Sequence, residues 1–127
     1  FNREAEETLL FQIWIETARR NAEPRWDTRR FPGAGRAGKL VALASGRNGD
    51  DALRINQDAA VLGAHLDAGQ TVVHALGTRR AYLVPAKGIV LVNDVRIPAR
   101  DGAAISGEES VVIEAVEDAE LVLVDVP

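Results

Sequence analysis

The two histidines of this chain and a neighbouring aspartate are the residues best suited to chemistry. His65 and Asp67 are two residues apart, so on a strand their side chains point to the same face. If residues 68–69 form a two-residue turn, His74 pairs with Gly63 and lies diagonally across from His65. Two histidines and a carboxylate on one face could transfer protons, as in a metal-free acid–base enzyme. The alternative is that Asp67 ends the strand and begins the turn, which leaves His65 in water at the rim.

Metal and thiol chemistry is restricted by composition. The 127 residues include two histidines and no cysteine. Disulfides, thiolate metal ligands and cysteine nucleophiles are therefore excluded. A centre of three or four histidines cannot be assembled from this chain. We expect it to hold no metal and no other cofactor.

The charge of the chain argues against nucleic acid as a partner. The formal net charge is -4 at pH 7, whereas nucleic-acid-binding domains are usually basic. Five arginines fall within residues 19–30, and residues 101–127 carry eight acidic side chains and no basic one. The arginine-rich segment could bind phosphate or an acidic partner. We favour instead a solvated loop whose arginines pair with nearby acids and with the acidic C-terminal strands.

No segment has the length of a membrane span. The longest apolar runs are about five residues, against roughly 20 for a membrane helix. No charged-then-apolar leader opens the chain, so we expect a cytoplasmic location and no membrane partner. The chain also contains no methionine. We expect it to be cut from a longer protein, the alternative being a trimmed start.

Short apolar runs separated by turn residues are typical of an all-β sandwich or barrel. Asn48-Gly49 predicts a hairpin, and we expect further hairpins across residues 67–69 and 85–88. So many short strands favour a double-sheet jelly roll of about ten antiparallel strands. The predicted strands are Thr8–Ile15, Lys39–Ala44, Ala52–Gln57, Val61–Leu66, Gln70–Leu76, Ala81–Val84, Ile89–Val92, Val95–Ile97, Gly102–Ile105, Val111–Ala115 and Leu121–Val126.

We expect residues 1–7 to be an N-terminal tail or linker and residues 8–127 to be a single domain. The strand predicted at Thr8–Ile15 is apolar on both faces, and such strands are usually covered on both sides. Leu10 and Trp14 then contact a partner domain or lie in this domain's own core. Truncation of Trp14 is predicted to be among the most damaging single changes. Residues 22–38 form a long connection with a short helical turn near residues 24–28.

The stretch from residue 70 to residue 105 resembles the cupin barrel. The glycines and the proline of the two cupin motifs are largely kept, at Gly69, Gly88 and Pro98. The metal ligands are not. His74 falls on the first histidine position, whereas three other residues stand where a second histidine, a glutamate and a third histidine would be. These three are Leu76, Ala81 and Ala103.

Five segments in order make the whole chain similar to the C-terminal half of a bacterial pirin-family protein, which is a bicupin. They are Phe11–Ile15, the loop ending at Phe31, Gln57–Ala59, Asp101–Ser106 and Ala119–Asp125. The resemblance implies an N-terminal cupin that binds an iron-type metal and that, in members similar to quercetin 2,3-dioxygenase, oxidises flavonols such as quercetin. It implies a C-terminal cupin without metal. The family's catalytic residues have no counterpart here.

These observations favour a non-catalytic, metal-free C-terminal cupin that packs on a metal-bearing N-terminal cupin or self-associates. One alternative is a free-standing small-molecule-binding or regulatory module. Its ligand would occupy the vestigial cupin cavity, unless neighbouring leucines and valines fill that space. A second alternative is the metal-free acid–base enzyme using His65 and His74. The residues expected to line the cavity are Val72, His74, Leu76, Ala81 and Ala103.

Overall fold

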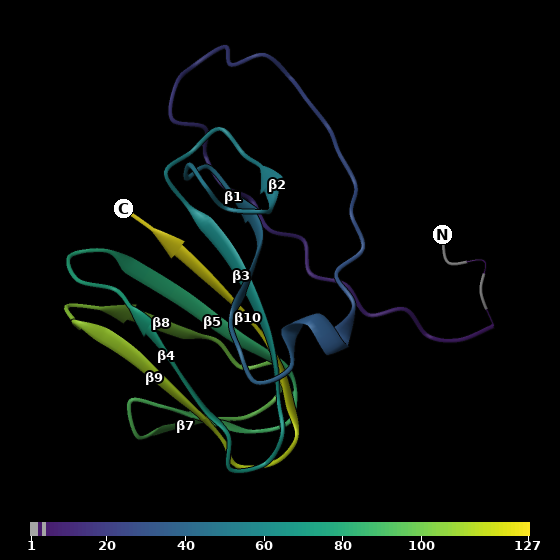
Figure 1. Ribbon diagram of the computed structural model, residues 1–127, viewed down its shortest axis with the longest axis vertical. Coiled ribbons are helices and arrows are strands. Elements are labelled where there is room, and N and C mark those ends of the chain that lie inside the picture. The colour runs from purple at the N-terminus through teal and green to yellow at the C-terminus, as the bar shows by residue number, and fades with distance from the viewer. Residues whose placement is uncertain (1–2, 4) are drawn as a thin grey trace.

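The structure, a computed structural model, describes Arg3 and residues 5–127. Phe1, Asn2 and Glu4 of the expected tail lie outside the described residues. The described residues form ten strands and one 3-10 turn (Figure 1). In chain order these are η1 (Gly33–Arg36), β1 (Val41–Ser45), β2 (Leu53–Arg54), β3 (Ala60–Leu66), β4 (Thr71–Ala75), β5 (Arg80–Lys87), β6 (Val90–Val92), β7 (Val95–Ile97), β8 (Ala103–Ser106), β9 (Ser110–Ala115) and β10 (Ala119–Val126).

The strands form two sheets with one hydrophobic core between them (Figure 1). The larger sheet has the order β2-β1-β3-β10-β5-β8, and the smaller sheet has the order β4-β9-β6-β7. In the described part of the chain, all strand pairs are antiparallel except the short β1–β2 pair. The all-β, double-sheet fold with about ten strands, expected from the sequence, is confirmed.

Alternating side chains of the strands fill the space between the sheets. In β10, Ala119, Leu121, Leu123 and Asp125 are buried, and the residues between them are half-buried. A strand sends successive side chains to opposite faces, so these four residues share the inner face. The inner row of β10 therefore carries one carboxylate, Asp125, in a face otherwise made of aliphatic side chains.

Two of the predicted hairpins are wrong, because strands that follow one another in sequence lie in different sheets. β3 pairs with β1 and β10, whereas β4 pairs with β9. Likewise β5 pairs with β10 and β8, whereas β6 pairs with β7 and β9. The turns after β3 and β5 carry the chain across the core, so that each strand meets the opposite sheet with its apolar row. A local turn signal does not distinguish such a crossing from a reversal within one sheet.

The hairpin predicted at Asn48-Gly49 is also wrong. β1 and β2 run parallel and share a two-residue register, Ala44–Ser45 with Leu53–Arg54. The loop between them begins with a tight bend at the end of β1, where the Arg47 backbone N–H donates to Ser45 Oγ at 3.0 Å. The chain thus makes a wide loop after β1 and re-enters the sheet in the same direction.

The predicted first strand, Thr8–Ile15, is absent from the described structure. This segment crosses the outer face of the larger sheet instead, in the purple part of Figure 1. Beyond it, the Ala18 backbone N–H donates to the Asn56 carbonyl at 2.8 Å. Because the segment lies on the face of the sheet rather than at an edge, no neighbouring strand is in place to form a ladder with it. Trp14 is 87% exposed, so the alternative that it lies in this domain's own core is wrong. The prediction that truncation of Trp14 is highly damaging assumed a buried side chain and is revised in the Discussion.

The long connection from residue 22 to residue 38 differs from the prediction in one detail. Residues 24–28 are not helical, and the helical turn is η1, after Pro32. Among the residues that the structure describes, no helix is long and apolar enough to cross a membrane.

Candidate functional site

The most unusual group in the fold is the carboxylate of Asp125, near the C-terminal end of β10. Its side chain is 1% exposed. Strand alternation sends it to the inner face, between Ala60 of β3 and Ala81 of β5 in the register of the larger sheet. A buried carboxylate is strongly unfavourable unless it is paired and hydrogen-bonded. The surroundings of Asp125 therefore define a candidate site.

Three side chains from different parts of the chain contact this carboxylate. Arg79, in the turn between β4 and β5, donates from Nε to Oδ1 at 2.6 Å. Arg47, in the loop after β1, lies with Nη2 2.8 Å from the same oxygen, as an ion pair rather than a well-aligned hydrogen bond. His74 of β4 lies with Nε2 2.6 Å from Oδ2. Because β4 belongs to the smaller sheet, the His74–Asp125 contact connects the two sheets.

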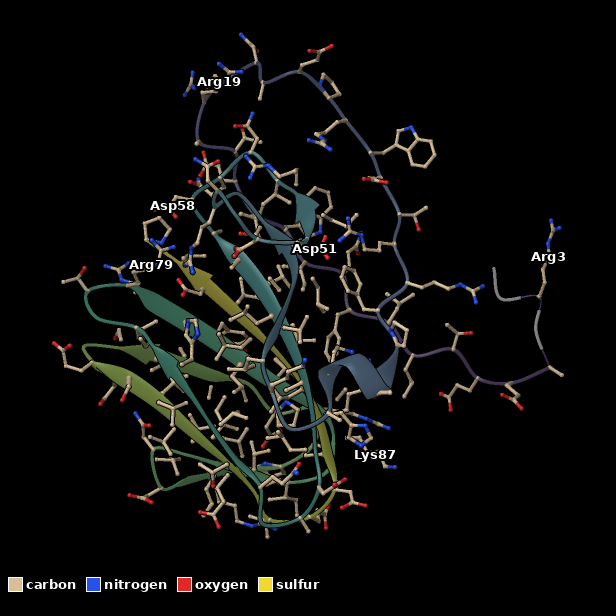
Figure 2. All side chains as sticks on the ribbon, viewed as in Figure 1. Arg3, Arg19, Asp51, Asp58, Arg79 and Lys87 are labelled. Carbon is tan, nitrogen blue, oxygen red and sulfur yellow. The ribbon has the colours of Figure 1, made fainter. Side chains whose placement is uncertain are left out.

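A second carboxylate, that of Asp58, lies nearer the surface than that of Asp125. Arg79 contacts it with Nη1 at 2.9 Å from Oδ2 and also donates from Nη2 to its backbone carbonyl at 2.7 Å. Arg47 approaches the other carboxylate oxygen with Nε at 3.6 Å. Figure 2 shows Asp58 and Arg79 together at the end of the molecule where β10 ends. Each arginine thus bridges a buried carboxylate and an exposed one.

These contacts set the ionisation of the site. Burial raises the pKa of Asp125, but its contacts with Arg79, Arg47 and His74 outweigh this and leave the pKa below the usual value. Burial lowers the pKa of Arg79, and its bonds to Asp125 and Asp58 outweigh this and raise the pKa. Asp125 is therefore ionised, and the short contact requires that His74 Nε2 carry a hydrogen and donate it.

The histidine arrangement considered for acid–base chemistry is not formed. His74 lies opposite Val111 in the smaller sheet, not opposite Gly63, and His65 lies opposite Glu120 in the larger sheet. His65 is exposed on the outer face, whereas His74 is directed to Asp125 within the molecule. The expected pairing of His74 with Gly63 was wrong because residues 67–69 connect two sheets rather than two strands of one sheet.

The five residues predicted to line a vestigial cavity have different surroundings. Val72, Leu76 and Ala81 belong to the hydrophobic core, and Ala103 is partly buried against it. Of the five, His74 alone takes part in the site around Asp125. Within the described residues, no group of three or more histidine, aspartate or glutamate side chains is placed to hold a metal ion.

Sequence reasoning missed Asp125, Arg79, Arg47 and Asp58. One signal was available, because an acidic residue follows Leu121 and Leu123 in a row that alternation assigns to the core. The arginines carried no comparable signal. Arg79 is 46 residues and His74 is 51 residues from Asp125 along the chain.

Residues 42–126, which span all ten strands apart from the first residue of β1, match the family of the quercetinase C-terminal cupin domain. The chain therefore belongs to this family of C-terminal cupins, which confirms the resemblance to pirins. It is 55% identical to a pirin-like protein of Caulobacter vibrioides over 98% of this chain and 55% of that protein. It is 33% identical to a quercetin 2,3-dioxygenase of Escherichia coli over 100% of this chain and 54% of that enzyme.

A solved structure of a similar protein also matches this chain. The crystal structure of YhhW from Escherichia coli superposes with a TM-score of 0.82 at 30% identity, covering 90% of this chain and 48% of that one. The chain thus spans about half the length of the relatives that it matches.

Proposed function

We propose that this chain is the non-catalytic, metal-free C-terminal cupin of a pirin-like bicupin and that it packs on a metal-bearing N-terminal cupin. The proposal rests on which side chains occupy the cupin ligand positions and on what those side chains contact. Leu76, Ala81 and Ala103 supply apolar side chains to the core or its border. The remaining histidine, His74, is bound to the buried carboxylate of Asp125. A metal would need about three nitrogen or oxygen ligands converging on one point.

The surface of the N-terminal segment supports the packing part of the proposal. Five large apolar side chains in a row of six residues are exposed, namely Leu9, Leu10, Phe11, Ile13 and Trp14. Monomers seldom expose contiguous apolar patches beyond a few hundred Å². Contacts between domains of one chain bury about 600–1,500 Å². A second domain seated on this segment would cover these side chains.

The oxidation of flavonols such as quercetin is assigned by this proposal to the N-terminal cupin and its iron-type metal. Relatives called quercetin 2,3-dioxygenase are about twice as long as this chain, which leaves room for such a domain. The proposal keeps the cytoplasmic location expected from the sequence.

The test compares this 127-residue chain with the complete product of its reading frame, by amide hydrogen exchange. We expect the reading frame to encode an upstream cupin with a His-x-His motif. Amides of residues 9–14 should exchange quickly in the short chain and be protected in the complete protein. Amides around Trp26, which is also exposed, serve as the internal control and should exchange alike in both. Equal exchange of residues 9–14 in both proteins would contradict the packing surface, and an upstream region without a cupin would contradict the bicupin.

A further inference from the structure

A cavity lies at the other end of the larger sheet from Asp125. It has a volume of about 550 Å³, is open to solvent, and lies between the N-terminal segment and the outer face of the sheet. One wall is Leu9–Phe11, and the opposite wall is formed by η1, β5, β10 and the loop between β7 and β8. Figure 2 shows Lys87 of this cavity beside η1, far from Asp58 and Arg79. The volume is within the range of about 300–1,000 Å³ that small-molecule sites have.

The cavity has an excess of positive charge. Arg36, Lys87 and Arg100 line it, together with one carboxylate, Glu120. Glu120 is already paired, since Arg36 Nη2 donates to its Oε1 at 2.9 Å. Lys87 and Arg100 make no ion pair with any other residue that the structure describes. Two cations therefore remain available to an anion.

Arg36 lies beside these two cations in the wall of the cavity. Its Nε is buried and has no hydrogen-bond partner among the described residues, although its Nη2 is bonded to Glu120. A buried donor without a partner is unfavourable. Because this Nε has almost no accessible surface, it belongs to the wall of the cavity, and Lys87 and Arg100 are the groups that an anion can reach.

The backbone of β5 has a β-bulge beside this cavity. The β5–β10 register pairs Glu120 with Lys87 and then Leu121 with Pro85, which leaves Ala86 as an extra residue. This β-bulge lets Ala86 and Lys87 both line the cavity, although they are adjacent. Bulges often redirect side chains next to functional sites.

Two further backbone features lie next to Arg100 and Arg36. Arg100 has a φ of 71°, and its backbone N–H donates to the Pro85 carbonyl at 2.7 Å. Gly63 lies under Arg36, because a Cβ at Gly63 would come within 3.4 Å of Arg36 Cδ. The backbone of Arg100 is thus joined to β5, and the side chain of Arg36 packs on Gly63 of β3.

We propose that this cavity binds a small organic anion that has a carboxylate or similar acidic group on an apolar, aromatic-sized body. The acidic group is recognised by Lys87 and Arg100. The body packs on the apolar walls formed by Leu9–Phe11 and Val122. Inorganic phosphate would leave these walls unused. The site is separate from the cupin ligand positions. It uses the sides of Leu9–Phe11 that face the cavity, so that their outer sides are left for the second domain proposed above.

The test uses two fluorescent probes with this chain. The first is 8-anilinonaphthalene-1-sulfonate, which carries an anionic group on an aromatic body, and the second is the neutral N-phenyl-1-naphthylamine. We expect the double variant Lys87→Ala/Arg100→Ala to bind the sulfonate at least about tenfold more weakly, because charge-assisted contacts are lost. Its affinity for the neutral probe should be unchanged. Added salt should weaken binding of the sulfonate only.

Arg96→Ala provides the matched control, since Arg96 is an exposed cation of β7 in the smaller sheet. It should bind both probes as the wild type does. Equal sulfonate affinity of the double variant and the wild type would overturn the proposal, since the probe would then occupy only exposed apolar surface. Loss of sulfonate binding in the complete protein, with the fold intact, would also overturn it, because the cavity would then be a contact for another polypeptide.

Discussion

At the scale of one residue, the contact between His74 and Asp125 differs from what the resemblance to the cupin motifs implied. By that resemblance, His74 falls on the first histidine position of the metal motif. In the structure, its Nε2 is directed to a carboxylate at 2.6 Å. That carboxylate is also held by Arg79 and Arg47. A histidine that was expected to mark a metal site therefore takes part in a polar connection between two sheets.

The first prediction concerns the stability that Asp125 provides. Asp125→Asn should lower the free energy of unfolding by about 3–5 kcal/mol, because the charges of Arg79 and Arg47 would remain in place without their buried partner. Urea denaturation measures the change, and Asp94→Asn on the exposed turn between β6 and β7 is the control. His74→Ala should cost less, about 1.5–3 kcal/mol for one hydrogen bond to a charged group, and should leave the fold intact. A larger loss for His74→Ala than for Asp125→Asn would contradict this order.

The second prediction concerns pH. The pKa of Asp125 is lower in the folded state than its ordinary value, which is about 3.9 for an unfolded chain. Ionised Asp125 therefore stabilises the fold fully above that ordinary value, and this stabilisation is lost as the pH falls toward the lower, folded-state pKa. The difference in urea midpoint between wild type and Asp125→Asn should be constant near neutral pH and shrink below about pH 4. A difference that grew on acidification would show that the sign is wrong.

At the scale of elements, the N-terminal segment shows the largest departure from expectation. Its alternating apolar residues predicted a strand covered on both sides, and the structure places it on the outer face of the larger sheet. Its inner side does cover the sheet, since Ile13 and Ile15 line a cavity with Val61, which is buried although it points outward from β3. Its other side is open, as Trp14 shows. Apolar residues on both faces of the segment thus indicated a contact on each side. The larger sheet of this chain provides the contact on one side only.

The third prediction follows from this exposure. Trp14→Ala should change the free energy of unfolding of this chain by no more than about 0.5 kcal/mol, as is usual for surface positions. Leu121→Ala in the core should cost about 2–5 kcal/mol. The two variants are compared by urea denaturation of the 127-residue chain. In the complete protein, Trp14→Ala should weaken the contact between the domains, whereas Trp26→Ala, the matched exposed tryptophan, should not. A large loss of stability in the short chain would show that Trp14 supports this domain itself.

At the scale of the whole molecule, the described residues combine packing between two sheets with a cluster of ion pairs. The inner faces of the two sheets form one hydrophobic core, which includes Leu76 and Ala81, two of the residues that the resemblance to cupins places at ligand positions. The polar groups are at one end of the sheets, and the cation-lined cavity is on the outer face. In the function proposed above, this domain supports a second domain, and the metal of that second domain performs the chemistry.

The fourth prediction tests this view by metal analysis. The purified 127-residue chain should contain well under one equivalent of iron, zinc, nickel or copper after expression in metal-supplemented medium. The reason is that Leu76, Ala81 and Ala103 have no ligand atoms and His74 is bound to Asp125. The complete protein, prepared in parallel, should contain close to one equivalent. A stoichiometric ion in the short chain that disappears in His74→Ala would contradict the proposal.

The sequence alone determined the all-β class, the approximate number of strands and the resemblance to C-terminal pirin cupins. The first two follow from composition and from a side-chain period of two, and the resemblance follows from short motifs, all of which are local. The tertiary structure decided which strands pair, which side of the N-terminal segment is open and which groups surround Asp125. These features depend on residues that lie far apart in the chain, such as His74 and Asp125, separated by 51 positions. Contacts of that kind arise when two sheets pack on each other, and no local pattern records them.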